Sequence, residues 1–171
     1  MKLKQTHVTY GLVTGIATIV FSALMLTMKV DMESGMQYLM YVIILIGLIL
    51  NANAYAKANN NYVTYSNIYG SCFKAVLIIA AFSTVWGAVV TFAFPELKDE
   101  VLSKMASDFE SKDTPEEQAQ MVLDATDKYW AVTMIFGSLA GILFAGAVLS
   151  LIAAAIPKKK GALPEHMQQP Q

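Results

Sequence analysis

Residues 130–156 read WAVTMIFGSLAGILFAGAVLSLIAAAI, a run of 27 residues without a charged side chain. A hydrocarbon core of about 30 Å is crossed by about 20 residues of helix, so this run predicts a transmembrane span. Aromatic rings and lysines favour the membrane–water interface. We therefore predict that the span is anchored at one end by Tyr129 and Trp130 and at the other by Lys158, Lys159 and Lys160.

Three further apolar runs lie upstream, at residues 8–29, 36–56 and 72–94. The first is longer than the 7–15-residue core of a signal peptide, so we predict a retained span. The chain is 56% hydrophobic and 15% charged, against about 45–50% and 25% in soluble domains. These features predict an all-α polytopic membrane protein, with residues 1–160 forming a single four-helix bundle and residues 161–171 a disordered tail.

The segment 96–128, between the third and fourth spans, has a different composition. It contains ten of the thirteen acidic residues and four lysines, which gives it a net charge of −6. Thr114-Pro115-Glu116-Glu117 is a helix-start signature with Thr114 as N-cap. We predict a helical hairpin, with one helix before this signature and one after it, packed through Leu97, Val101, Met105 and Phe109 on the first helix and Met121, Val122 and Ala125 on the second.

The distribution of lysines predicts the orientation, because cytoplasmic loops retain Lys and Arg. The N-terminus has two lysines, the second loop has Lys57 and Lys74 with no acidic residue, and the tail has three lysines and one glutamate, whereas the loop before residue 36 and the segment 96–128 are acidic. With four spans, the N-terminus, the second loop and the tail all lie on one side of the membrane, and the two acidic loops lie on the other. We therefore predict a protein of the cytoplasmic (inner) membrane with both termini in the cytoplasm, the acidic hairpin outside, and a cytoplasmic loop anchored at the membrane surface by Tyr62, Tyr65 and Tyr69.

Candidate catalytic groups are scarce. The interiors of the predicted spans have no Asp, Glu, Arg or His, and both histidines lie near the chain ends. Intramembrane chemistry usually needs such residues. Cys72 is the single cysteine, which excludes an intramolecular disulfide and a CxxC site. We predict no enzymatic activity, cofactor, metal site or nucleic-acid binding.

Two features of the spans leave alternatives open. Asn51 and Asn53 near the end of the second run are interpreted first as a helix end leaving the hydrocarbon, and alternatively as amide hydrogen bonding between helices. Gly11 and Gly15 in the first run, and Gly137, Gly141 and Ala145 in the fourth, permit close helix packing. We predict that this packing is intramolecular, with a face for homo-oligomerisation as the alternative.

Several short motifs occur in order along the chain: YGLVTG at 10–15, YVTY at 62–65, PEL at 95–97, TPEEQ at 114–118, GSL at 137–139, SLI at 150–152 and KKK at 158–160. Together they resemble an uncharacterised family of four-helix bacterial membrane proteins, domain of unknown function 4199, over about residues 5 to 160. The resemblance implies the four-span architecture and brings no assigned activity.

From these observations we predict a non-catalytic scaffold or interaction protein. Its partners are expected to be the lipid bilayer and a protein that contacts the acidic hairpin. The alternative is a small oligomeric transporter or channel lined by Thr, Ser and Asn.

Overall fold

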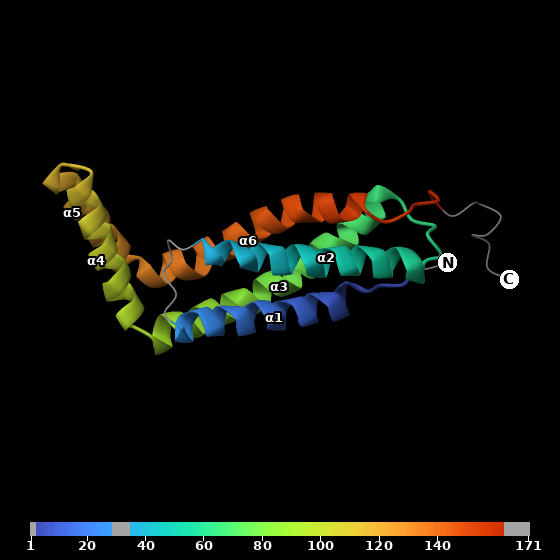
Figure 1. Cartoon of the computed structure of the whole chain (residues 1–171), viewed down its shortest axis with the longest axis horizontal. Helices are drawn as coiled ribbons and strands as arrows, with labels where there is room; N and C mark the ends of the chain where they lie inside the picture. Colours follow the sequence, from blue (N-terminus) through green and yellow to red (C-terminus); the bar gives the residue numbers. More distant parts are fainter. Residues whose placement is uncertain (1–2, 29–34, 163–171) are drawn as a thin grey trace. The chain divides into compact units, whose positions relative to one another are not determined.

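The computed structural model describes residues 3–28 and 35–162, and the regular structure of that part of the chain consists of helices, without strands (Figure 1). The helices are α1 (His7–Thr27), the 3-10 turn η2 (Met36–Tyr38), α2 (Leu39–Ala58), α3 (Tyr65–Ala93), α4 (Glu96–Ser111), α5 (Glu116–Lys128) and α6 (Trp130–Ala155). Residues 31–34 of the charged turn expected at 31–35, and the predicted tail from residue 163 onward, lie outside the described residues.

Four helices are long and apolar enough to cross a membrane: α1, α2, α3 and α6, with 21, 20, 29 and 26 residues. The prediction of an all-α chain with four candidate spans is therefore confirmed. The boundaries differ most at α3, which begins at Tyr65 and not at Cys72. Much of the predicted loop 57–71 is consequently helical.

The asparagine run at 59–61 makes the turn between α2 and α3. Asn60 and Asn61 have left-handed backbone conformations, with φ of 53° and 62°. The Asn60 N–H donates to the Lys57 carbonyl (3.0 Å), and the Asn61 N–H donates to the Ala56 carbonyl (2.8 Å). This is the Schellman pattern that ends a helix, and asparagine tolerates its left-handed position better than most residues.

The early start of α3 is explained by a reciprocal cap. The Asn67 N–H donates to Thr64 Oγ1 (3.2 Å), while the Thr64 N–H donates to Asn67 Oδ1 (3.1 Å). These bonds form a capping box in which asparagine takes the place of the usual Glu or Gln. Two orphan N–H groups are thus satisfied at the first turn of α3.

The chain divides into two compact units, which are considered separately. The first comprises α1, α2, α3 up to Ser83, and α6 from Gly141 onward; the second comprises residues 84–140, including α4 and α5. The core of the first unit is formed by fully buried side chains of α2 and α3, notably Ile44, Leu48, Ile68, Val76 and Ile79.

Close helix packing in the first unit depends on glycines. A Cβ on Gly11 would lie 3.0 Å from Ile78 Cβ, and a Cβ on Gly15 would lie 3.3 Å from Phe82 Cβ, so α1 lies directly against α3. Two glycines that the GxxxG pattern did not include make closer approaches. A Cβ on Gly47 would lie 2.0 Å from Thr14 Oγ1, and one on Gly146 would lie 2.3 Å from Val76 Cγ1.

The second predicted motif, on α6, differs from the first. Gly137 and Gly141 are exposed, and apart from chain neighbours and the nearby backbone of α6 itself, no described atom lies within 4 Å of where their Cβ atoms would be. Ala145 is half-buried. The close contact of α6 with α3 is made at Gly146, one residue after the predicted stripe, on a different face of the helix.

Candidate functional site

Helices α4 and α5 form the charged part of the second unit, and each has a defined boundary. Glu96 and Asp99 occupy the first turn of α4, where negative charge is favourable for the helix dipole. The helix ends in a second Schellman turn. Asp113 has a φ of 49°, its N–H donates to the Glu110 carbonyl (3.2 Å), and the Thr114 N–H donates to the Phe109 carbonyl (3.0 Å).

The start of α5 differs from the predicted capping box. The helix begins at Glu116, and the residue flanking it is Pro115, with φ −53° and ψ 131° and no side-chain capping bond. The prediction of Thr114 as N-cap is therefore wrong. The extended conformation of Pro115 moves the first helical residue one position along, and Thr114 belongs to the turn that ends α4.

The two helices lie side by side in antiparallel orientation (Figure 1). Lys98 in the first turn of α4 pairs with Asp127 in the last turn of α5, with 2.5 Å between Nζ and Oδ1. Both side chains are partly exposed, so the pair contributes less than about 1 kcal/mol. On α4 the predicted apolar stripe, comprising Leu97, Val101, Met105 and Phe109, is half-buried.

The apolar face of α5 differs from the prediction. Met121 is 66% exposed, Val122 is 42% exposed, and Ala125 is also exposed. The half-buried apolar positions are instead Ala119 and Leu123. This helix has two short apolar faces at helical spacing, and Met121 and Val122 lie on the exposed one.

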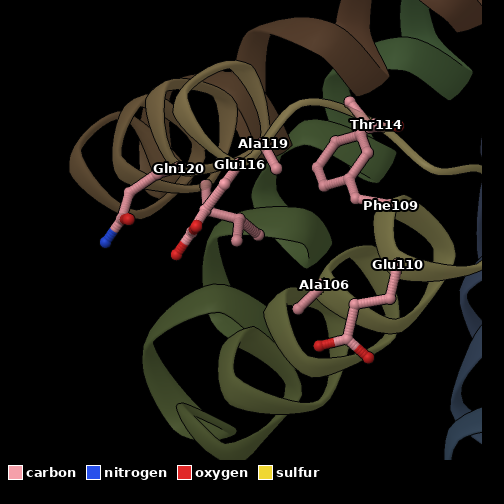
Figure 2. Close-up of a pocket in the computed structure, with 8 residues that line it drawn as sticks. Ala106, Phe109, Glu110, Thr114, Glu116, Ala119 and Gln120 are labelled. Carbon is pink, nitrogen blue, oxygen red and sulfur yellow. The ribbon is translucent and has the colours of Figure 1, made fainter.

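A cleft of about 430 Å³ lies between the two helices near the turn that joins them. Its apolar lining consists of Ala106, Phe109, Ala119 and Leu123. Its polar lining consists of Glu110, Thr114, Glu116 and Gln120. Figure 2 shows the ring of Phe109 between the helices, with Glu110 on the α4 side and Glu116 on the α5 side.

A buried polar network lies in the first unit, centred on Asn51 of α2, which is 0% exposed. The Thr6 hydroxyl donates to Asn51 Oδ1 (2.7 Å), and Asn51 Nδ2 donates to Ser71 Oγ (3.3 Å) and more weakly to Cys72 Sγ (3.8 Å). The alternative interpretation, amide hydrogen bonding between helices, is therefore confirmed for Asn51, and the exit of this helix end from the hydrocarbon stays a prediction. Asn53, in contrast, bonds to the Ile49 carbonyl of its own helix (2.9 Å).

This network has the properties of a structural element. Cys72 is fully buried, and its thiol donates to the Leu48 carbonyl (3.6 Å). No group of three or more His, Cys, Asp or Glu that could hold a metal occurs among the described residues. The arrangement ties α2 to α3 and to the segment before α1.

Comparison with known proteins places this architecture in a family. A family model described as "Protein of unknown function (DUF4199)" matches residues 9–159. The chain belongs to this family. The resemblance seen in the sequence is confirmed over nearly the same range. Neither a search of curated proteins nor a search of solved structures found a match.

In this DUF4199 chain the predicted anchor residues contact one another. The Tyr65 hydroxyl donates to the Leu151 carbonyl (2.9 Å), and Lys159 Nζ lies 5.9 Å from the centre of the Tyr65 ring. Lys160 Nζ lies 5.1 Å from the Tyr62 ring, and the Lys160 N–H donates to the Asn61 carbonyl (2.7 Å). The lysines after α6 therefore lie against the α2–α3 turn.

The other predicted anchors are distributed over both units. Tyr69 stacks on Phe73 with 6.0 Å between ring centres, and Lys158 is exposed. Lys128 Nζ lies 5.4 Å from the Tyr129 ring, while Trp130 is half-buried. The location of these residues at a membrane surface stays a prediction.

Proposed function

We propose that this chain is a non-catalytic scaffold or interaction protein of the cytoplasmic membrane, with the α4–α5 pair presented outside the membrane as its contact surface. The observation that carries the proposal is the exposure of Met121 and Val122 on a charged helix. Contiguous exposed apolar side chains with polar residues around them mark protein contact surfaces, and methionine is enriched at such surfaces. The net charge of −6 over residues 96–128 adds electrostatic selectivity for a basic partner.

The orientation is supported by the lysines around the α2–α3 turn. Lys159 and Lys160 contact Tyr65 and Tyr62, so the positive charge after α6 adds to that of Lys57 at the end of α2. A cluster of lysines at one end of the spans favours the cytoplasmic side. With four spans, the connection between α3 and α6 then lies on the other side.

The non-catalytic part of the proposal is supported by the composition of the predicted spans, whose interiors have no Asp, Glu, Arg or His. Several polar side chains of the helices bond within the chain. Thr18 donates to the Gly15 carbonyl and Ser150 to the Gly146 carbonyl. These hydroxyls donate to backbone carbonyls of their own helices and do not need water or a partner chain as acceptor. No observation favours an oligomeric pore over the interaction role.

The orientation can be tested by labelling single cysteines. Ser111→Cys is expected to react with a membrane-impermeant maleimide in cells whose outer permeability barrier has been opened, whereas Lys158→Cys should react only after lysis. Both positions are exposed, and fully buried Cys72 provides a silent background. Labelling of Lys158→Cys before lysis would contradict the predicted orientation.

The interaction role can be tested by photo-crosslinking in cells. A photoreactive phenylalanine analogue at Met121 is expected to give a discrete adduct larger than the chain. The same analogue at exposed Ser103 on α4 serves as the control. An adduct with the mass of two or more copies of this chain would favour the oligomeric alternative, and equal adducts from both positions would count against a specific surface.

A further inference from the structure

The α4–α5 cleft combines two properties that suit one kind of ligand. Its inner surface is apolar and includes the aromatic ring of Phe109 and the side chain of Leu123. Glu110 and Glu116 bring a carboxylate from each helix, and none of the lining residues is basic (Figure 2). A ligand that fills the cleft therefore needs an apolar stem and a positively charged head.

The volume of the cleft and the negative charge around it also suit a positively charged ligand. A volume of about 430 Å³ is within the range of about 300–1,000 Å³ typical of ligand sites. The surrounding segment has a net charge of −6, which attracts cations and repels anions before contact. Charge complementarity thus selects a basic occupant.

We propose that the cleft receives an arginine side chain from a basic segment of the protein partner. Arginine matches the site better than lysine because its planar guanidinium stacks on an aromatic ring and donates to carboxylates in two directions. Its alkyl stem packs along the apolar lining, with the guanidinium between Glu110 and Glu116. This inference rests on the proposed interaction role and assigns the partner's chemistry.

Peptide binding to the full-length chain tests the proposal. The protein is placed in nanodiscs of zwitterionic phosphatidylcholine, so that the lipid itself does not attract the probe. The probe is a short alanine-based peptide with three arginines and a rhodamine label, and matched peptides carry lysine or glutamine instead. Anisotropy at low ionic strength, about 50 mM, is expected to give the order arginine, lysine, glutamine from tightest to weakest.

A matched pair of double variants distinguishes the effect of the carboxylates that line the cleft from the effect of the overall negative charge of the segment. Glu110→Gln with Glu116→Gln removes two carboxylates that line the cleft. Asp108→Asn with Glu117→Gln removes two exposed carboxylates that do not. Both doubles remove one charge near the end of α4 and one from the first turn of α5, so their effects on helix stability are similar.

The cleft variant is expected to weaken the arginine peptide about tenfold or more, and the control variant about twofold or less. Equal weakening by both would overturn the proposal, because it would show general electrostatic attraction only. Equal binding of the arginine and glutamine peptides would overturn it as well.

The role of the aromatic ring is tested with Phe109→Leu, which retains apolar volume and thereby protects the helix pair. This variant is expected to remove the preference for the arginine peptide over the lysine peptide. Circular dichroism verifies that it is folded. An unchanged preference in a folded variant would overturn the stacking contribution.

The outcome is separable from that of the crosslinking experiment. A Met121 adduct that forms equally well with Glu110→Gln and Glu116→Gln in place, together with equal weakening by both double variants, would reject the arginine site and retain the interaction role. Cleft-specific peptide binding without any Met121 adduct would reject the contact surface on the outer face of α5.

Discussion

Gly146→Ala is expected to destabilise the first unit by about 1–3 kcal/mol, the usual cost of overpacking a tightly packed core. The new Cβ would lie 2.3 Å from Cγ1 and 2.8 Å from Cγ2 of Val76. Val76 is fully buried and its χ1 is stiff, so the side chain cannot move aside without displacing its neighbours. Thermal unfolding of the purified protein in mild detergent measures the loss.

Gly141→Ala is the matched control on the same helix. Outside the nearby backbone of its own helix, a Cβ at Gly141 meets no described atom within 4 Å, so we expect unchanged stability or a gain of up to about 1 kcal/mol from the helix preference of alanine. Val76→Ala combined with Gly146→Ala removes the two clashing methyl groups and should recover part of the loss. Equal stability of the two glycine variants would contradict the close approach of α6 to α3.

The four candidate spans were predictable because their signal is long and chemically simple. About 20 consecutive apolar residues have few alternative interpretations, and each run in the sequence corresponds to a helix in the structure. The helical nature of the acidic segment was likewise visible in its four-residue apolar spacing. Both signals depend on residues close together in sequence.

The partners of each helix face were harder to predict. The GxxxG spacing identified Gly137 and Gly141, yet the close contact of α6 is at Gly146. The same limit applies to α5, where Met121 and Leu123 lie on different faces and only the position of α4 determines which is covered. Periodicity defines the faces of a helix, whereas the contacts depend on residues distant in sequence.

Capping shows how a local signal can be misplaced. Thr114 precedes Pro and two glutamates, a strong signature, but the structure has no side-chain cap there. The reciprocal cap occurs at Thr64 and Asn67, where asparagine replaces the Glu or Gln of the usual pattern. The signal was present at residues 64–67, and the polar, tyrosine-rich composition of the segment favoured a loop.

Asn51→Leu is expected to cost about 2–3 kcal/mol. Leucine has the branching and the number of side-chain heavy atoms of asparagine but is bulkier, so the loss combines polar groups left without their partner with overpacking of a buried site. Ser71 Oγ loses its donor, and the Thr6 hydroxyl loses its acceptor, in a site where Asn51 is 0% exposed. Each interhelical hydrogen bond of this kind contributes about 0.6–1.7 kcal/mol in a membrane protein, and an unsatisfied buried group adds to the loss.

Asn53→Leu provides the comparison, since it is the same substitution two residues along the same helix. The Asn53 amide donates to the Ile49 carbonyl of its own helix, and that carbonyl keeps its helical position when the side chain is removed. We expect a change within about 0.5 kcal/mol. The two substitutions alter the composition of α2 identically. A difference between their unfolding temperatures in detergent therefore measures the contribution of the Asn51 hydrogen bonds and not the effect of added hydrophobicity.

A double-mutant cycle distinguishes the loss of the hydrogen bond from the overpacking by the larger side chain. Ser71→Ala in the Asn51→Leu background replaces both partners of one bond with apolar groups, which removes one of the polar groups left without a partner and should recover part of the stability. If the double variant loses the sum of the two single losses, the bond between α2 and α3 does not contribute. Recovery shows that Asn51 and Ser71 stabilise the packing of the two helices together.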